Sequence, residues 1–257
     1  MTTLKEKLRR KQPTIGSWLS LCDPHVCEMM AKQGGFDWLV VDMEHTATDM
    51  SGMAHMIQII DLCGLDALVR VGANDPLLIK RALDAGATGV IIPQVNSRED
   101  ALAAVSSAHY PPAGTRGAGL FRAHGYGADS QAYYASVADR TTVIVQIEHH
   151  EGVRNVDDIM AVDGVDGFLI GPYDLSASLG QSGNFDHPDV VACLDRLAAY
   201  AGTGDKAAGV HVVQPDADLL KRRVGEGFIF VAYGTDVLFL GERLAVAKRE
   251  VAALAGT

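Results

Sequence analysis

The stretches "VIVQIE" (143–148) and "GFLIGPYD" (167–174) each begin as a run of apolar residues and then reach an acid, Glu148 or Asp174. Apolar runs without polar alternation are typical of strands buried on both faces, as in parallel sheets. Burying a charge costs on the order of several kcal/mol unless something compensates it. The two acids therefore indicate a place where the chain needs a charge partner.

The same kind of strand recurs along the whole chain. Six more apolar runs occur at 14–20, 36–43, 66–71, 89–95, 209–213 and 228–234. Amphipathic helical patterns lie between or after them, notably at 75–87, 97–110, 187–202, 215–227 and 240–257. Asp75 followed by Pro76, and Ser97 followed by Asp100, are typical helix starts. Eight strands alternating with helices predict an α/β protein, a (β/α)₈ barrel formed by residues 1–257 as one domain.

An open doubly wound sheet is the alternative fold for this alternation of strands and helices. That fold favours a G-x-G-x-x-G motif after the first strand, and the sequence has none there. The segment 111–140 interrupts the pattern and is rich in Gly, Ala and aromatic residues. An excursion of this length from a barrel usually forms a functional loop or an interface.

The composition excludes several classes of protein. The net charge is −10, which argues against nucleic acid and anionic membrane surfaces as partners. No run approaches the ~20 apolar residues of a membrane span, and the charged N-terminus does not read as a signal peptide. The four cysteines form no C-x-x-C pair, which indicates reduced thiols in a cytoplasmic protein.

Polar residues collect where the predicted strands end, which is where barrel enzymes place their chemistry. Candidates in chain order are Asp42, Glu44, His45, Arg70, Gln94, Gln146, Glu148, Tyr173, Asp174, His211, Thr235 and Asp236. Carboxylates on neighbouring strand ends, such as Glu148 and Asp174, suit a divalent metal ion. Mg²⁺, Mn²⁺ and Co²⁺ all accept oxygen ligands of this kind. The alternative is that the two acids pair with basic residues or cap helices.

Arg70 and His45 complete the predicted site. Arg70 ends a strand with no acid beside it in sequence, so we expect an unpaired guanidinium suited to a carboxylate or a developing oxyanion. His45 is the best general acid–base candidate, because histidine titrates near neutrality. Asp42 or Asp84 would orient it; otherwise His45 is structural. His211 is expected to line the pocket rather than bind the metal.

No lysine falls at a predicted strand end. A Schiff-base aldolase needs one there, so activation of a carbonyl on this chain would depend on a metal.

Several motifs in order resemble the metal-dependent pyruvate aldolases of the HpcH/HpaI family, the 4-hydroxy-2-oxoheptanedioate aldolase type. They are "FDWLVVDMEH", "LVRV", "HYPPAGTRGAG", "VIVQIE", "GVDGFLIGPYDLSASLG" and "GNFDHPDV". The resemblance runs from about residue 12 to residue 245. It implies a homo-hexameric barrel, a trimer of dimers with an exchanged C-terminal helix, acting on a 2-oxo acid and an aldehyde.

The resemblance also implies roles for individual residues. Glu148 and Asp174 would hold the metal, Arg70 would stabilise the enolate oxygen, and His45 with its acids would transfer protons together with a metal-bound water. The substrate would contact Gln146, Gly171, Pro172, Tyr173, His211 and Val212. A neighbouring subunit's pocket would be walled by Arg116, Leu120 and Arg122.

Because the sequence departs from the family pattern at two positions, the identity of the substrate is left unassigned. Tyr173 replaces a small residue and Met43 replaces a frequent glycine. The nucleophile would be pyruvate or hydroxypyruvate, and the aldehyde is unassigned. Two rival functions are a CoA-thioester lyase of the citrate lyase β-subunit or malyl-CoA type, and a non-catalytic barrel that binds a small acid.

Overall fold

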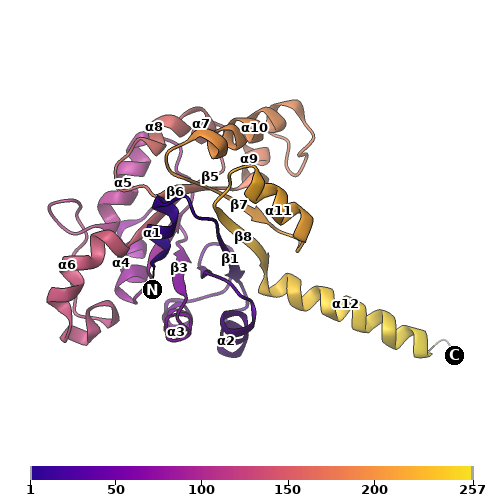
Figure 1. Ribbon diagram of the computed structural model, residues 1–257, viewed down its shortest axis with the longest axis horizontal. Helices are drawn as coiled ribbons and strands as arrows, with labels where there is room; N and C mark the ends of the chain where they lie inside the picture. The colour runs from indigo at the N-terminus through magenta and orange to yellow at the C-terminus, as the bar shows by residue number, and fades with distance from the viewer. Residues whose placement is uncertain (1, 256–257) are drawn as a thin grey trace.

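Eight parallel strands close into a barrel in the computed structural model, which describes residues 2–255 (Figure 1). The strands are β1 (Thr14–Leu19), β2 (Trp38–Asp42), β3 (Asp66–Arg70), β4 (Gly89–Ile92), β5 (Thr142–Ile147), β6 (Gly167–Ile170), β7 (Ala207–Val212) and β8 (Phe230–Thr235). Each strand pairs with the next, and β8 returns to β1. The predicted (β/α)₈ barrel is confirmed, and the doubly wound sheet is not formed.

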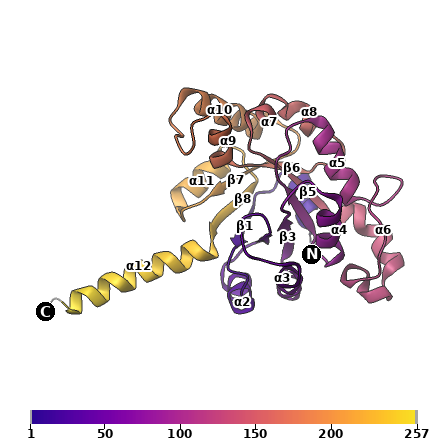
Figure 2. The ribbon, with the colours of Figure 1, turned by 180° about the vertical axis from the view of Figure 1, so that it is seen from behind.

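The described residues also form a series of helices, most of which pack around the outside of the barrel (Figures 1 and 2). They are α1 (Leu4–Arg9), α2 (Pro24–Gln33), α3 (Met50–Leu62), α4 (Pro76–Asp84), α5 (Arg98–Ala108), α6 (Ser130–Arg140), α7 (His150–Arg154), α8 (Val156–Met160), α9 (Pro172–Ser178), α10 (Pro188–Thr203), α11 (Ala217–Gly225) and α12 (Asp236–Ala255), with a 3₁₀ segment η1 (Arg122–Gly127). The predicted caps are confirmed: Asp75 accepts from two backbone N–H groups, and Ser97 and Asp100 form a capping box.

Side chains alternate between the barrel interior and the helix layer, because successive residues of a strand point to opposite faces. Trp38 and Phe230 fill the interior, where their rings stack with centroids 4.2 Å apart. Gly16 on β1 makes room for this pair, because a Cβ there would lie 2.0 Å from the Trp38 ring. The interior is therefore a packed core, and a binding site must lie at one of its ends.

The N-terminal end of the barrel is closed by α1. Leu4 and Leu8 pack into the interior core cluster. Lys5 is buried among them, and its Nζ lies 2.8 Å from Asp166 Oδ2 and 2.6 Å from the Thr141 carbonyl oxygen. The same Asp166 oxygen accepts from the Val143 N–H at 2.9 Å. This end is sealed, which leaves the C-terminal ends of the strands for the site.

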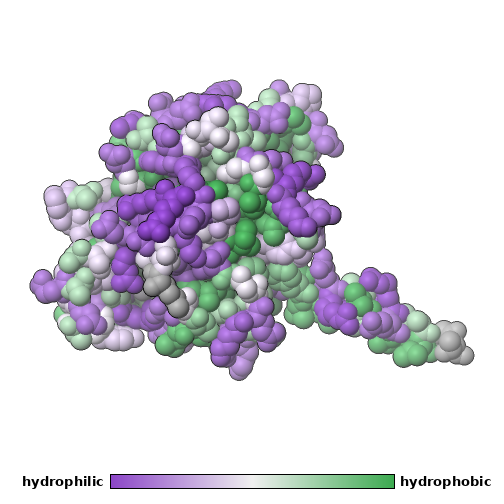
Figure 3. Space-filling view, viewed as in Figure 1, coloured by the Kyte–Doolittle hydropathy of each residue, from purple (hydrophilic) through white to green (hydrophobic). Residues whose placement is uncertain are grey.

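Helix α12 extends away from the body after its first turns (Figure 1). The Asp236 carboxylate fixes its start by accepting from the backbone N–H groups of Ser20 and Leu21 at 2.9–3.0 Å. Farther along, Leu240, Leu244, Val251 and Leu254 are exposed. Figure 3 shows apolar residues on this helix and on the adjoining face of the body. Across residues 2–255, no helix is both long enough and apolar enough to cross a membrane.

We expect Lys5→Met to lower the free energy of unfolding by about 3 kcal/mol, because it leaves the Asp166 carboxylate buried without its cation. Urea unfolding followed by circular dichroism would measure the loss. Lys32→Met is the matched control, since Lys32 pairs with Glu28 on the exposed face of α2 and should not change the midpoint. Equal midpoints for the two variants would contradict the structural role of Lys5.

Candidate active site

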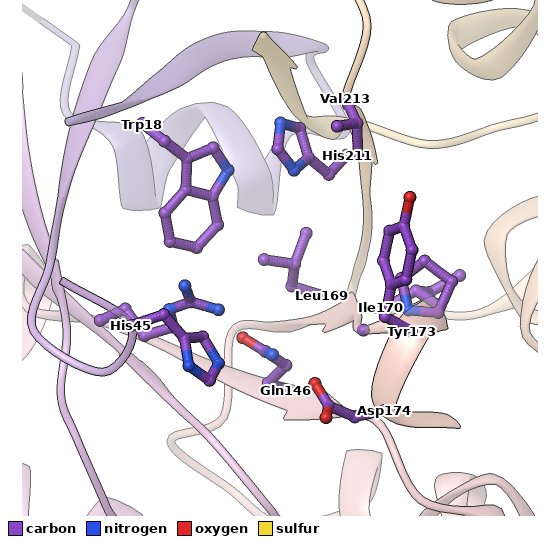
Figure 4. Close-up of a pocket in the computed structure, with 12 residues that line it drawn as sticks. Trp18, His45, Gln146, Leu169, Ile170, Tyr173, Asp174, His211 and Val213 are labelled. Atoms are coloured by element: carbon purple, nitrogen blue, oxygen red, sulfur yellow. The ribbon is translucent and has the colours of Figure 1, made fainter. Parts of the chain in front are cut away.

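A cavity of about 350 Å³ opens at the C-terminal ends of the strands (Figure 4). Its lining consists of Trp18, His45, Arg70, Gln146, Leu169, Ile170, Gly171, Pro172, Tyr173, Asp174, His211 and Val213. Most of these residues continue the inward-facing series of their strands. For example, Arg70 lies two residues after the core residue Leu68, and Gln146 two residues after Ile144.

Arg70 is paired, and the expectation of a free guanidinium was wrong. Its Nε and Nη2 lie 2.9 and 2.6 Å from the two Asp42 carboxylate oxygens. The register of β2 and β3 places Asp42 directly beside Arg70, although 28 positions separate them in sequence. The Trp18 ring covers the guanidinium at 4.4 Å. The bidentate pair and the aromatic face hold Arg70 in one orientation at the cavity wall.

Glu148 is a buried carboxylate that does not itself line the cavity but contacts two residues of its lining, Gln146 and Gly171. One of its oxygens accepts from the Gln94 backbone N–H at 2.8 Å, and the other accepts from the Gln146 side-chain amide. Burial raises the pKa of Glu148, and the nearby charges of Glu44 and Asp174 raise it further. Gly171 makes room for this carboxylate, because a Cβ there would lie 2.7 Å from Glu148.

Asp174 and Glu44 face the same region. Asp174 lies in the first turn of α9 and is exposed to the cavity. Burial raises the pKa of Glu44, while Arg70, 3.5 Å from it, acts in the opposite direction. Glu44 also has a buried oxygen without a hydrogen-bond partner, as does the Gln146 amide. Hard oxygen donors with excess negative charge fit a divalent cation.

The donor set is a partial one. Within residues 2–255, no three His, Cys, Asp or Glu side chains converge as a complete metal cage. Glu148 and Asp174 would therefore supply two ligands and leave the remaining positions to water and substrate, as Mg²⁺ sites commonly do. His149 and His150 lie outside this set: His149 caps α7, and His150 contacts Ser178.

His45 is exposed at the cavity rim, with Nε2 3.5 Å from a Glu44 oxygen. Asp42 does not orient its imidazole; its Oδ1 accepts from the backbone N–H groups of Glu44 and His45. Asp84 lies elsewhere. It ends α4, near the start of β4 and thus toward the opposite end of the barrel, and pairs with Arg116 at 2.6 Å. Within one chain, neither predicted acid supports the His45 ring.

The other expected residues separate into two groups. Gln146, Gly171, Pro172, Tyr173 and His211 line the cavity. Val212 does not, because it points outward into the core between the sheet and the helices, and Val213 takes its place. This is a shift of one residue, which in a strand means the opposite face.

The 111–140 segment lies away from this cavity. Arg116 is buried against Asp84, Leu120 is exposed, and Arg122 pairs with Asp61. None of the three lines the cavity of its own chain.

Trp18 lines the cavity, although it was not predicted as a site residue. Its strand was predicted, and Trp18 lies near the C-terminal end of the inward-facing residues of that strand. This position could have identified it as a site residue. Its contact with Arg70 crosses from β1 to β3 and has no signal in a single sequence.

The structure separates a structural carboxylate from a free one, which gives a test. Asp42→Asn should lower the free energy of unfolding by about 2 kcal/mol, because it weakens two charge-assisted hydrogen bonds to Arg70. Asp174→Asn, in the same cavity but exposed, should cost no stability. Urea midpoints compare the two. Equal losses for both variants would contradict this division.

The chain matches the HpcH/HpaI aldolase/citrate lyase family model over residues 14–241. It is 39% identical to a hydroxypyruvate/pyruvate aldolase of Pseudomonas aeruginosa, covering 92% of this chain and 87% of that protein. It is also 39% identical to a 4-hydroxy-2-oxo-heptane-1,7-dioate aldolase of Klebsiella pneumoniae, covering 92% and 88%.

A solved structure from the same family is also similar to this chain. A crystal structure of a HpcH/HpaI aldolase/citrate lyase family protein from Burkholderia cenocepacia superposes with a TM-score of 0.90 at 36% identity, covering 98% of this chain and 99% of that one. The barrel, the acids at its strand ends and the match over most of the chain agree, and the protein belongs to the HpcH/HpaI aldolase/citrate lyase family.

Proposed function

We propose that the protein is a metal-dependent carbon–carbon lyase, a class II aldolase. It would add the enolate of pyruvate or hydroxypyruvate reversibly to an aldehyde and cleave 4-hydroxy-2-oxo acids in the other direction. The observation that carries this proposal is that Asp174 and the fixed Arg70 guanidinium line one cavity, and that the Glu148 carboxylate contacts two of the cavity's lining residues, Gln146 and Gly171. Among the described residues that line this cavity there is no lysine. The names of the relatives at 39% identity support the same reaction class.

Glu148 and Asp174 would hold the divalent ion. When bound, it would polarise the ketone of the 2-oxo acid and make the adjacent carbon more acidic. Mg²⁺, Mn²⁺ and Co²⁺ all suit these oxygen ligands. Gln146, between the strand core and the cavity, would contact substrate or water through its unpaired amide oxygen.

The chain's own residues would position charge and protons. Arg70 presents a fixed positive charge to the ketone oxygen, where negative charge develops as a C3 proton leaves. The C3 carbon then bonds to the aldehyde carbon, and the aldehyde oxygen gains a proton. His45, exposed at the rim, would take the C3 proton, directly or through a water, and return it to the aldehyde oxygen, and cleavage would run both transfers in reverse. First-turn N–H groups of α9 around Tyr173 and Asp174 have no intrahelical acceptor and would bind the substrate carboxylate.

We also propose a homo-hexamer, a trimer of dimers that exchanges α12. The apolar residues along this protruding helix would be covered by a second chain. Asp84 lies too far from His45 in its own chain, so its expected support of a His45 ring would come from a neighbour. Arg116, Leu120 and Arg122 all belong to the 111–140 segment, and they would form part of the wall of a neighbouring subunit's pocket. The four free cysteines suit a cytoplasmic location.

The cavity lining favours this reaction over a CoA-thioester lyase. Coenzyme A carries phosphates, and a site for them needs clustered basic residues. Among the described residues lining the cavity, Arg70 is the only Lys or Arg, so the lining has no basic cluster for these phosphates. A non-catalytic barrel has no need of a buried Glu148 whose pKa is raised by its surroundings.

Exchange of pyruvate methyl protons with deuterated water, followed by NMR, would test the proposal. Exchange should stop with EDTA and return with Mg²⁺ or Mn²⁺. Glu148→Gln should slow it by about a thousandfold, because several kcal/mol of charge stabilisation is lost. Glu151→Gln, an exposed acid on α7, is the matched control and should exchange like the native protein.

Exchange that survives EDTA, or that Glu148→Gln leaves intact, would contradict the metal role. No exchange of pyruvate or hydroxypyruvate by the metal-loaded native protein would overturn the aldolase proposal and favour the thioester or binding alternatives.

A further inference from the structure

His211 presents a hydrogen-bond acceptor to the cavity. It lies on the inward face of β7, and its Nε2 is 3.1 Å from the Gly234 carbonyl oxygen. A carbonyl oxygen only accepts, so Nε2 carries the proton. In the neutral ring, Nδ1 is then a bare acceptor. Figure 4 shows the second ring nitrogen directed toward the middle of the cavity.

The surroundings keep this ring neutral. Burial lowers the pKa of His211 to about 4, and the Arg70 charge contributes to the lowering, while the bond to Gly234 acts against it. Protonation would therefore require a pH well below neutrality, and at pH 7 the acceptor lone pair on Nδ1 is retained.

Trp18 presents the complementary donor. Its indole N–H is buried and has no acceptor among the described residues. Its ring centroid lies 5.7 Å from that of His211, and both side chains line the same cavity. Figure 4 shows the indole nitrogen on the side of the ring that faces His211. A buried donor without a partner costs roughly 1–3 kcal/mol, so a ligand that accepts from it is favoured.

We propose that Trp18 and His211 form a subsite for a hydroxyl group on the acceptor aldehyde. A hydroxyl can accept from the indole N–H and donate to Nδ1 at the same time, which neither a methyl group nor a carboxylate can do. An anionic group at this position would face the lone pair of Nδ1. This inference rests on the proposed aldolase function and names its acceptor class: aldehydes with a hydroxyl near the carbonyl.

A matched pair of acceptors would test the subsite. Glycolaldehyde and propanal have the same number of heavy atoms and differ by a hydroxyl in place of a methyl group. The kcat/KM for addition of pyruvate to each gives a ratio, and comparing that ratio between native and variant protein cancels their intrinsic difference in reactivity. His211→Phe, which keeps a ring but loses the acceptor, should lower the ratio about tenfold.

Two further variants separate hydrogen bonding from packing. Trp18→Phe should also lower the ratio, although loss of its contact with Arg70 will slow both reactions. His211→Gln retains a side-chain acceptor and should recover the native ratio to within about threefold. His55→Phe makes the same chemical change on the exposed face of α3 and should leave both rates at native values.

A native protein that shows metal-dependent pyruvate exchange, with a ratio unchanged in both His211→Phe and Trp18→Phe, would overturn the subsite and leave the aldolase function standing. If His211→Phe does not fold, the Trp18→Phe and His211→Gln ratios decide. Absence of exchange in the native protein would overturn the proposed function itself.

Discussion

The site depends on a carboxylate that the fold buries at the end of β5. Glu148 is almost fully enclosed, and its two oxygens accept only from neutral donors, the Gln94 N–H and the Gln146 amide. Two neighbouring carboxylates, Glu44 and Asp174, act on it with charges of the same sign. The electrostatic potential around Glu148 is therefore negative, and a bound divalent cation would neutralise it. The chain packs closely around this group: Gly171 leaves room for it, and Gln94, whose N–H donates to it, has a positive φ.

The two-residue period of the strands determines which other side chains face the barrel interior and the cavity. On the inward face, Trp38 and Phe230 begin their strands at the sealed end, next to the α1 plug, and Arg70, Gln146 and His211 lie at the open end. The same alternation sends Val212 to the outer layer and Val213 to the cavity. Arg70 gains a fixed orientation from Asp42 on the neighbouring strand, so it contributes a rigid positive charge beside the acids.

Local patterns in the sequence were sufficient for the eight strands, the helix caps and the rim acids, because each is encoded by a short run of residues. Contacts between residues on different strands could not be predicted in this way. The Asp42–Arg70 pair and the Trp18 face over Arg70 follow from strand register, which a single sequence does not contain. Asp84 was expected beside His45, yet α4 runs antiparallel to the strands and carries Asp84 toward the other end of the barrel. The lowered pKa of His211 follows from burial and from the Arg70 charge, and its tautomer follows from the Gly234 carbonyl; all three are set by tertiary structure.

The central claim, that Glu148 and Asp174 share one divalent ion beside Arg70, is tested most directly by anomalous X-ray diffraction from crystals grown with Mn²⁺. We expect a single strong anomalous peak at the cavity, with carboxylate oxygens of both residues about 2.0–2.3 Å from it. A peak that touches only one of the two acids, or a cavity without metal at saturating Mn²⁺, would contradict it.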